Sequence, residues 1–311
     1  MKKPAFVLSL TTNDNDYQME QAVAAQEAAT RAGVDVQIIF ADNDAITQSQ
    51  QLLKIIQASG LHPDGIILEP VGGTALPQVA RAAASAGIGW VVLNRDVEYV
   101  SDFRRTYKTP VFSITSDHEE IGRIQGRQFA ALLPQGGSVL YIQGPSESLA
   151  AKQRTSGMYE TRPENVQIRL MKGNWTEASA YRAVGSWLRL STSQQAQFDL
   201  IAAQDDSMAI GARKAFDDLP DDSRGRWLSL PFTGCDGMPK SGQAWVQSGL
   251  LTATVVVPAN AGQAVEMLAR QIQHGIAPPE RTMTVPHSFP AIDALAPAQK
   301  EKKRGRSAGI I

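Results

Sequence analysis

At 311 residues the chain is longer than the roughly 250–300 residues at which one hydrophobic core usually stops growing, so we expect two domains. Its 43% hydrophobic and 20% charged residues are typical of a globular protein and exclude collagen-like and disordered chains. A disulfide framework is excluded because Cys235 is the only cysteine. The formal net charge of −1 gives no indication of a nucleic acid partner or of an anionic membrane surface.

The first residues do not form a recognisable export signal. Lys2 and Lys3 precede the apolar run 5–10, but this run is too short for the core of a signal peptide. No stretch reaches the about 18 apolar residues of a transmembrane helix, so we expect no membrane insertion. Two interpretations stay open: either the protein is cytoplasmic, or its export signal is missing from this chain.

Short apolar runs alternate with alanine-rich amphipathic segments in the first third of the chain. The expected strands are 6–10, 34–40, 65–68 and 90–93, and the expected helices are 17–32, 46–59 and 76–86. Gly33 and Gly60 follow the first two helices, where a glycine commonly ends a helix. Alternating strands and helices with short connections predict a parallel sheet with helices on both faces.

A second series of the same kind follows the turn-rich segment 101–110. Its expected strands are 111–115, 138–142, 166–171, 198–202 and 227–232, and its expected helices are 119–133, 149–159, 177–190, 207–216 and 240–248. A last helix, 259–274, precedes the proline-rich segment 277–290 and a basic tail. The pattern predicts an α/β protein with two doubly wound parallel-sheet lobes, which bind ligands beyond the carboxyl ends of the strands.

Polar and aromatic side chains follow many of the predicted strands. They lie at 13–18, 69–70, 94–96, 144–148, 175, 205–206 and 236. Carboxylates and amides accept hydrogen bonds from vicinal hydroxyls, arginine donates in paired geometry, and an aromatic face covers the apolar side of a sugar ring. Polar loop ends are also ordinary in any α/β fold, so composition alone leaves both interpretations open.

Six short motifs occur in an order that is more specific than any one of them. They are DGIIL at 64–68 before Glu69-Pro70, LNR at 93–95, SD at 116–117, AAKQR at 150–154, AQDDSMAIGA at 203–212 and GCDG at 234–237. With these motifs, about residues 4–285 resemble the periplasmic sugar-binding proteins of type I, the family typified by ribose-binding protein. The effector domains of lactose-repressor-type regulators share the same core.

The resemblance implies a set of ligand-binding residues in a cleft between the lobes. Asn15, Tyr17 and Gln18 would lie in the first loop, Arg95 and Arg154 would donate to ligand hydroxyls, Trp175 would stack, and Asp205 and Asp236 would accept, with Glu69 and Asn94 completing the set. Asp205 and Asp206 also fit the start of a helix, as its N-cap and first-turn acid, so we expect only one of them to face the ligand.

The resemblance also implies that the two lobes close on the ligand about a hinge of three segments, placed near residues 116, 257 and 277. The N-terminal lobe would then comprise 1–115 and 258–280, and the C-terminal lobe 116–257 and 281–290. We expect the tail 291–311 to be disordered.

The chain departs from the family pattern at several of these positions. The usual Asp-Arg pair after the fourth strand is Asn94-Arg95, the second aromatic residue of the first loop is Gln18, and the usual Asn after the third strand is Glu69. Valine stands at 256 and 257, where the family often has a glutamine. These departures argue against ribose and favour a differently decorated sugar or polyol.

Two other classes of protein are less consistent with the sequence. The pairs Asp205 with Asp206 and Glu69 with Asp236 have the composition of acid and base catalysts, but no catalytic motif accompanies them. The four histidines lack the spacing of metal ligands, so we expect no catalysis, cofactor or metal. A repressor would place a helix-turn-helix before the first strand, where this chain has no room for one.

The sequence therefore predicts a monomeric solute-binding protein of the periplasm or cell envelope. Its partners would be a small sugar or polyol and either the permease of an ABC importer or a chemoreceptor. Three alternatives stay open: the effector-sensing domain of a lactose-repressor-like regulator that lacks its DNA-binding segment, a chemosensory ligand receptor, and a free cytoplasmic binding protein.

Overall fold

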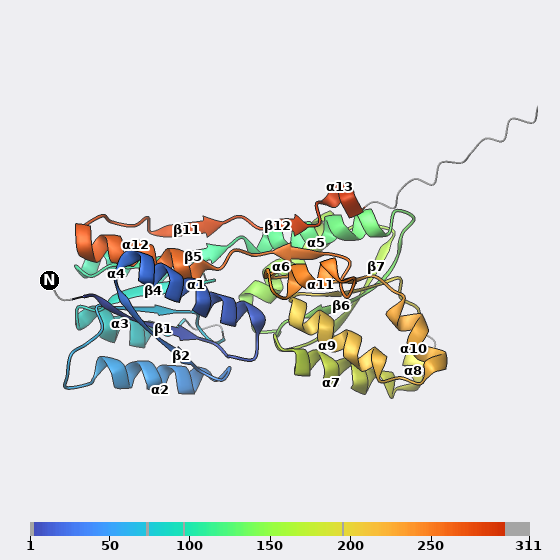
Figure 1. Cartoon of the computed structure of the whole chain (residues 1–311), viewed down its shortest axis with the longest axis horizontal. Coiled ribbons are helices and arrows are strands. Elements are labelled where there is room, and N and C mark those ends of the chain that lie inside the picture. The colour runs from blue at the N-terminus through green and yellow to red at the C-terminus, as the bar shows by residue number, and fades with distance from the viewer. Residues whose placement is uncertain (1–2, 73–74, 96, 195, 296–311) are drawn as a thin grey trace, which may run out of the picture.

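The computed structural model in Figure 1 describes residues 3–72, 75–95, 97–194 and 196–295. Two α/β lobes lie end to end along the long axis of the molecule, and the chain passes from one to the other several times. The predicted fold class, two doubly wound parallel-sheet lobes joined by a three-segment hinge, is confirmed. None of the helices in the described ranges is both long and apolar enough to cross a membrane.

The N-terminal lobe is built on a six-stranded parallel sheet of order β11-β5-β4-β3-β1-β2. Its strands are β1 (Ala5–Leu10), β2 (Asp35–Phe40), β3 (Gly65–Leu68), β4 (Gly89–Leu93), β5 (Val111–Ser116) and β11 (Arg281–Thr284). Its helices are α1 (Asp16–Ala32), α2 (Ala45–Ile56), α3 (Pro77–Ser85), α4 (Tyr99–Thr106) and α12 (Asn260–His274). Helices α1 and α12 share one buried cluster with the sheet, and α2, α3 and α4 share the other, so both faces are covered.

The C-terminal lobe has a four-stranded parallel sheet of order β7-β6-β8-β9 and a separate antiparallel pair, β10 with β12. Its strands are β6 (Gly137–Gln143), β7 (Val166–Lys172), β8 (Leu200–Ala203), β9 (Phe232–Thr233), β10 (Thr254–Val256) and β12 (His287–Phe289). Its helices are α5 (His118–Leu132), α6 (Leu149–Thr161), α7 (Glu177–Leu188), α8 (Ser191–Gln194), α9 (Asp206–Asp217), α10 (Asp221–Leu228), α11 (Gly242–Gln247) and α13 (Ile292–Leu295).

Helices α5 and α6 pack unusually closely, and two glycines make this possible. A Cβ atom on Gly122 would lie 2.0 Å from the carbonyl oxygen of Arg154, and one on Gly157 would lie 2.0 Å from that of Glu119. Any larger residue at either position would push the helices apart. The contact therefore fixes the position of α6, which carries Arg154 toward the space between the lobes.

The third connection between the lobes differs from the one expected. The chain crosses at 116–118, at 256–260 and at 284–287, and the last of these crossings contains Val285-Pro286 rather than residues near 277. Residues 281–284, assigned above to the C-terminal lobe, instead form β11 and pair with β5 in the N-terminal sheet. Without β11 the hydrogen-bonding groups of β5 would stand at an open edge, which folded proteins usually cover.

Other local predictions are also wrong. The segment 227–232, expected to be one strand, holds the end of α10 and the start of β9. The turn-rich segment 101–110 contains most of α4. Residues 291–295, expected to be disordered, include α13, and Ile292 packs against a buried cluster at the hinge. The rest of the tail lies outside the described residues.

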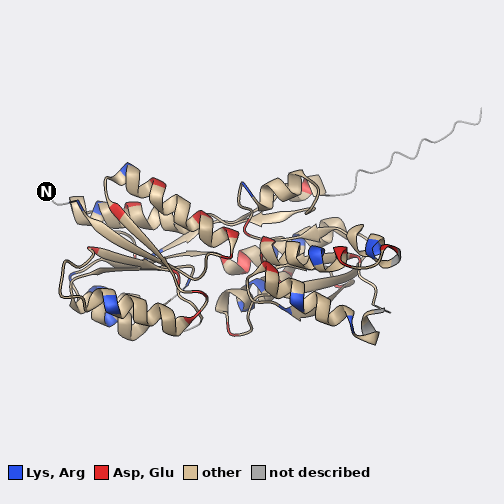
Figure 2. Ribbon diagram, turned by 60° about the horizontal axis from the view of Figure 1, so that its bottom comes forward, with Lys and Arg blue, Asp and Glu red and all other residues tan. Residues whose placement is uncertain are grey.

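Charged residues are interspersed along both lobes, as Figure 2 shows. Their distribution agrees with the nearly neutral composition of 30 basic against 31 acidic residues. The functionally informative charges are those buried between the lobes.

Candidate ligand-binding site

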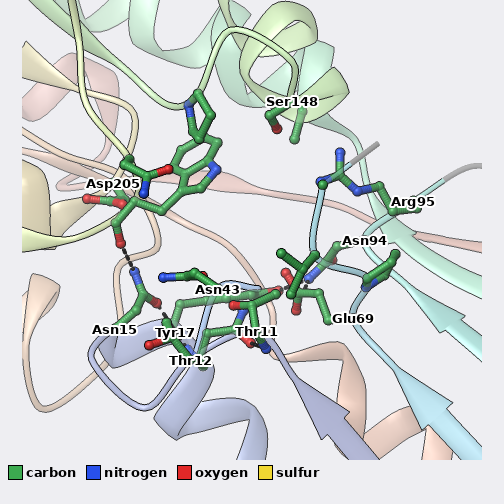
Figure 3. Close-up of a pocket in the computed structure, with 18 of the residues that line it drawn as sticks. Thr11, Thr12, Asn15, Tyr17, Asn43, Glu69, Asn94, Arg95, Ser148 and Asp205 are labelled. Atoms are coloured by element: carbon green, nitrogen blue, oxygen red, sulfur yellow. Dashed lines mark hydrogen bonds between the residues drawn. The ribbon is translucent and has the colours of Figure 1, made fainter. Parts of the chain in front are cut away.

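A cavity of about 160 Å³ lies between the lobes, at the carboxyl ends of the parallel strands. It is smaller than the roughly 300–1,000 Å³ of sites for drug-sized ligands, which indicates a small ligand. All ten side chains predicted from the sequence line it: Asn15, Tyr17, Gln18, Glu69, Asn94, Arg95, Arg154, Trp175, Asp205 and Asp236. Six of them are labelled in Figure 3, namely Asn15, Tyr17, Glu69, Asn94, Arg95 and Asp205.

Some lining residues escaped the sequence analysis. They include Thr11, Thr12, Asn43, His118 and Asn174. Thr11 and Thr12 directly follow β1, and Asn43 lies in the loop after β2, so the position of the strand ends could have revealed them. His118 follows β5 at the first crossing between the lobes, so the end of that strand also indicates its position.

Asn94 organises the wall contributed by the N-terminal lobe. Its Nδ2 donates to Glu69 Oε2 and to Tyr17 Oη, both at 3.0 Å, and its Oδ1 accepts from Asn260 Nδ2 at 2.7 Å. Its φ of 55° lies in the left-handed region, which asparagine tolerates better than most residues. Because both of its N–H groups are used within the protein, Asn94 acts by positioning Glu69 and Tyr17.

Glu69 is the carboxylate of the N-terminal lobe. Burial raises its pKa, while hydrogen bonds from Gln18 and Asn94 and the positive charges of Arg95 and Arg154 act in the opposite direction. Glu69 is thus held in place by neutral amides, and its side chain keeps partial access to the cavity. A ligand that donates hydrogen bonds would find an oriented acceptor here.

Arg154 is the buried cation of the C-terminal lobe. It donates from Nη1 to the backbone oxygen of Gln204, and the same nitrogen lies 3.8 Å from Asp236 Oδ1. Its guanidinium carbon is 5.4 Å from the ring centroid of Trp175, which is within the range of a cation–π contact. These contacts hold the guanidinium plane between Asp236 and the indole.

The indole of Trp175 lies directly over Gly144. A Cβ atom on Gly144 would stand only 2.1 Å from Trp175 Cζ2, so only glycine leaves room for the ring in this position. Trp175 itself has a φ of 59°, which strains a bulky side chain. Strain of this kind is commonly kept where a side chain must be aimed at a ligand.

The two adjacent aspartates at the start of α9 have different surroundings. Asp205 caps the helix, accepting from the Met208 N–H with Oδ1, and lines the cavity. Asp206 is buried away from the cavity, where it accepts from Gly237 N and Thr254 Oγ1, both at 2.7 Å. Burial raises the pKa of Asp205 to about 7 and that of Asp206 to about 8. Only one of the pair therefore faces the cavity, as the helix-start pattern indicated.

Several buried polar atoms of the cavity have no hydrogen-bond partner among the described residues. They are Arg95 Nη1, Arg154 Nε, Asp205 Oδ2 and His118 Nδ1. Burial lowers the pKa of His118 to about 3, so its ring is neutral. Its Nε2 lies 3.3 Å from the carbonyl oxygen of Asn94 and therefore donates, which leaves Nδ1 as an acceptor. Unpaired buried donors and acceptors are costly, and here both kinds converge on one cavity.

The lobes touch each other across the mouth of the cavity. Asn15 Nδ2 of the N-terminal lobe donates to the backbone oxygen of Trp175 at 2.9 Å (Figure 3). Nearby, the carboxylate of Asp16 accepts a hydrogen bond from Ser241, while burial and Glu177 raise its pKa. The structure is thus a closed arrangement of the lobes. Among the described residues no cluster of His, Cys, Asp or Glu is placed to hold a metal ion.

Two doubly wound lobes closed on a polar cavity define a bilobal binding protein. Residues 6–276 match the model of the periplasmic binding protein domain, and the chain belongs to this family. The predicted family is therefore confirmed, and with it the expectation of a solute-binding protein and not an enzyme.

Individual relatives are more distant. The chain is 31% identical over 193 residues to a putative rhizopine-binding protein of Rhizobium meliloti, a match that covers 60% of this chain and 59% of the relative. It is 24% identical over 270 residues to a ribose import binding protein of Bacillus subtilis, covering 86% and 81%. The chain thus spans less than two thirds of the first relative and most of the second.

Solved structures share the fold at low sequence identity. A galactofuranose binding protein superimposes with a TM-score of 0.78 at 21% identity, covering 94% of this chain and 96% of that protein. A Caulobacter myo-inositol binding protein, bound to myo-inositol, superimposes with a TM-score of 0.76 at 19% identity, covering 94% of both chains.

Proposed function

We propose that the protein captures a small sugar or polyol between its closing lobes and delivers it to the permease of an ABC importer at the cell envelope. The convergence of buried, unpartnered polar atoms on one closed cavity carries this proposal. Arg95 and Arg154 supply donors, while Asp205 and His118 supply acceptors, and a polyol offers both functions on each hydroxyl group.

The aromatic residues of the cavity add a second kind of support. Trp175 and Tyr17 line it from opposite lobes, and the Tyr17 hydroxyl is already engaged, donating to the backbone oxygen of Pro258 at 3.3 Å and accepting from Asn94. The aromatic ring of Tyr17 is therefore the part of the side chain that can contact a ligand. Rings of this kind cover the apolar face of a sugar or cyclitol. The names of the relatives, which include ribose and myo-inositol binding proteins, agree with this ligand class.

Thermal unfolding against a panel of pentoses, hexoses, deoxysugars and cyclitols tests the proposal. A ligand at 100 times its dissociation constant stabilises the folded state by about 2.7 kcal/mol. For domains of this size that corresponds to a rise in Tm of several degrees, at roughly 2–4 °C per kcal/mol. No rise with any member of the panel would contradict the proposal.

Two arginine variants show whether a rise comes from the cavity. Arg95→Ala removes a cavity donor, and truncating a buried charged hydrogen-bond partner costs about 2–5 kcal/mol of binding free energy, so the rise in Tm should disappear. The matched control is Arg105→Ala, because the Arg105 side chain is 76% exposed and contacts only Asp102 among recorded ion pairs of the described chain. An equal rise in wild type and in Arg95→Ala would place the ligand elsewhere.

A further inference from the structure

The side chain of Asn260 joins the three crossings between the lobes. Asn260 ends the second crossing and is buried. Its Nδ2 donates to Ser116 Oγ of the first crossing at 3.4 Å, and its Oδ1 accepts from Thr284 Oγ1 of the third crossing at 3.0 Å. The hydroxyl groups of Ser116 and Thr284 also contact each other, at 3.2 Å. These side chains therefore form a closed triangle of hydrogen bonds at the hinge.

The same amide reaches the wall of the ligand cavity. Nδ2 of Asn260 donates to Asn94 Oδ1 at 2.7 Å, which is shorter than its bond to the hinge serine. Asn94 in turn donates from its own Nδ2 to Glu69 Oε2 and Tyr17 Oη. Asn260 does not belong to the described lining of the cavity. It therefore lies behind the wall, one hydrogen bond away from the residue that positions Glu69 and Tyr17.

The hydrogen bonds run in one direction from the hinge to the cavity. Thr284 donates to Asn260, and Asn260 donates to Asn94. Asn94 then donates to Glu69. Hydrogen bonds aligned in this way polarise and strengthen one another. Because an amide oxygen cannot donate, reversing one amide of this chain would place two oxygens or two N–H groups against each other.

No local role explains the amide of Asn260. Asparagine at a helix start commonly caps the helix, but the N-cap of α12 is Ala259, and no side chain caps it. The N–H of Ala261 donates instead to Gln21 Oε1 of helix α1, at 2.7 Å. All hydrogen bonds recorded for the Asn260 side chain within the described residues cross to other segments, namely the hinge and the cavity wall.

We infer that Asn260 is a positioning residue of the ligand site, whose amide holds Asn94 in the orientation that presents N–H groups to Glu69 and Tyr17 and ties this orientation to the hinge. The inference rests on the proposed function for the use of the site and adds to it a residue outside the cavity. Glu69 is an oriented acceptor because Gln18 and Asn94 donate to it, and the contribution of Asn94 depends on Asn260.

Reversing the polarity of the amide tests the inference. Asn260→Asp keeps the shape of the side chain but replaces the donor to Asn94 by an oxygen. The aspartate would accept from Thr284 as before, and from Asn94 once the Asn94 amide has turned over. That turn brings Asn94 Oδ1 against the carboxylate of Glu69. At pH 8, chosen because a protonated Glu69 could donate to that oxygen, we expect the Tm to fall by several degrees and the affinity for the best ligand of the panel to fall about tenfold.

Glu69→Gln should rescue this variant. Glutamine has N–H groups that donate to the turned oxygen of Asn94, so the hydrogen bonds are paired again with their direction reversed. We therefore expect Glu69→Gln to stabilise the Asn260→Asp protein more than it stabilises wild type. Urea denaturation of the four proteins should give a coupling of about tenfold in the unfolding equilibrium constant, as for members of one hydrogen-bond network.

Two controls separate this coupling from simple charge repulsion between positions 69 and 260. In an Asn94→Ala background the intermediate amide is missing, so the coupling should disappear, whereas repulsion between the two carboxylates would persist. Asn165→Asp makes the same chemical change at an exposed position, and its effect should add to that of Glu69→Gln.

A second measurement uses variants without a new charge. Asn260→Leu removes the donor to Asn94, whereas Ser116→Ala removes a hinge contact and leaves the bond to Asn94 in place. Both variants should lower the Tm, but only Asn260→Leu should weaken ligand binding, about tenfold. A merely structural role at the hinge would affect stability in both variants and affinity in neither.

The outcomes distinguish the two proposals, because the stability cycle needs no ligand. Additive effects of Asn260→Asp and Glu69→Gln, or a coupling that persists without Asn94, would overturn the positioning role and leave the sugar receptor standing. Unchanged affinity in Asn260→Leu would overturn it as well. If no member of the panel binds while the coupling is present, the proposed function falls and the link from the hinge to Glu69 stands.

Discussion

Asn15 in the N-terminal lobe donates a hydrogen bond from Nδ2 to the backbone oxygen of Trp175 in the C-terminal lobe, at 2.9 Å. The same side chain begins helix α1, because its Oδ1 accepts from Gln18 N at 3.1 Å. Asn15 therefore caps helix α1 and also forms a hydrogen bond between the two closed lobes. Because the acceptor belongs to Trp175, whose indole lines the cavity, closure of the lobes is coupled to the position of this aromatic ring.

We expect Asn15→Ser to loosen the closed state without unfolding α1. Serine keeps an oxygen for the N-cap but has no amide to reach Trp175. Loss of one hydrogen bond of about 1 kcal/mol should weaken the best ligand of the panel about fivefold, mainly through faster dissociation. Stopped-flow tryptophan fluorescence measures that rate. Asn15→Ala, which also removes the cap, should lower the Tm in addition, and an unchanged dissociation rate in the serine variant would contradict a role in closure.

Gly144→Ala tests the position of the indole. The added methyl would stand 2.1 Å from Trp175 Cζ2, so the ring has to leave its place over the cavity wall and lose its contact with Arg154. We expect ligand affinity to fall about 30-fold, since an aromatic contact and a cation–π contact of about 1 kcal/mol each are lost. Titration calorimetry measures the loss.

The control for this variant is Gly185→Ala on helix α7. Nothing lies within 4 Å of a Cβ atom there, and alanine stabilises a helix interior by roughly 0.5–1 kcal/mol relative to glycine. Its Tm should rise slightly with unchanged affinity. Equal affinity in Gly144→Ala and wild type would show that the indole does not contribute to binding.

Much of the candidate site could be predicted because parallel strands end at one edge of a sheet. Glu69 follows β3, Asn94 follows β4 and Asp236 follows β9, and strand ends are visible as the limits of apolar runs. Arg154 lies on a helix and was predicted only from the resemblance to a family. Hydrogen bonds within the site were not predictable, because Asn94 contacts Asn260 across 166 residues of sequence.

The errors in the fold also have a nonlocal cause. Arg281–Thr284 has no apolar alternation, and it becomes a strand because the edge of β5 is available for pairing. Trp227 lies in an apolar run that favours a strand, but it belongs to the last turn of helix α10 and stacks on Phe216, with ring centroids 4.7 Å apart. In both cases tertiary contacts decide the local structure, and single-sequence patterns do not contain them.

Arg154→Lys should separate the charge of this residue from its shape. Lysine keeps the positive charge but loses the planar guanidinium that faces Trp175 and donates to Gln204. We expect binding to weaken by about 1.5–3 kcal/mol, the range of hydrogen bonds to charged groups, with stability largely kept. Arg154→Met, which leaves Asp236 without its cation, should also lower the free energy of unfolding by about 3–5 kcal/mol. Wild-type affinity in the lysine variant would contradict this role.

Asp206 gives the protein a stability that depends on pH. Its carboxylate is buried against Gly234 and Gly242, where added Cβ atoms would lie 2.1 and 2.0 Å from its oxygens. Burial and the nearby Asp205 and Asp16 raise its pKa to about 8 from an ordinary 3.8, although hydrogen bonds from Thr254 and Gly237 oppose the rise. Between about pH 3.8 and pH 8 the folded protein therefore holds a proton that the unfolded chain has released.

Because the folded state binds more protons in this window, the free energy of unfolding should decrease as pH rises toward 8. Asp205, whose pKa is raised to about 7, also makes the free energy of unfolding decrease as pH rises toward 7. His118 has the opposite effect below pH 6.5, because its pKa is lowered from 6.5 to about 3 and the unfolded chain takes up a proton that the folded protein does not. The range from pH 6.5 to 8.5 therefore isolates the carboxylates.

Asp206→Asn keeps the shape and hydrogen-bonding capacity of the side chain without the titration. The free energy of unfolding measured by urea denaturation should therefore change less with pH in this variant. At pH 8.5 we expect the variant to gain about 1–2 kcal/mol relative to wild type, since one pH unit of linkage is about 1.4 kcal/mol. Parallel profiles for the two proteins would show that Asp206 is ionised throughout.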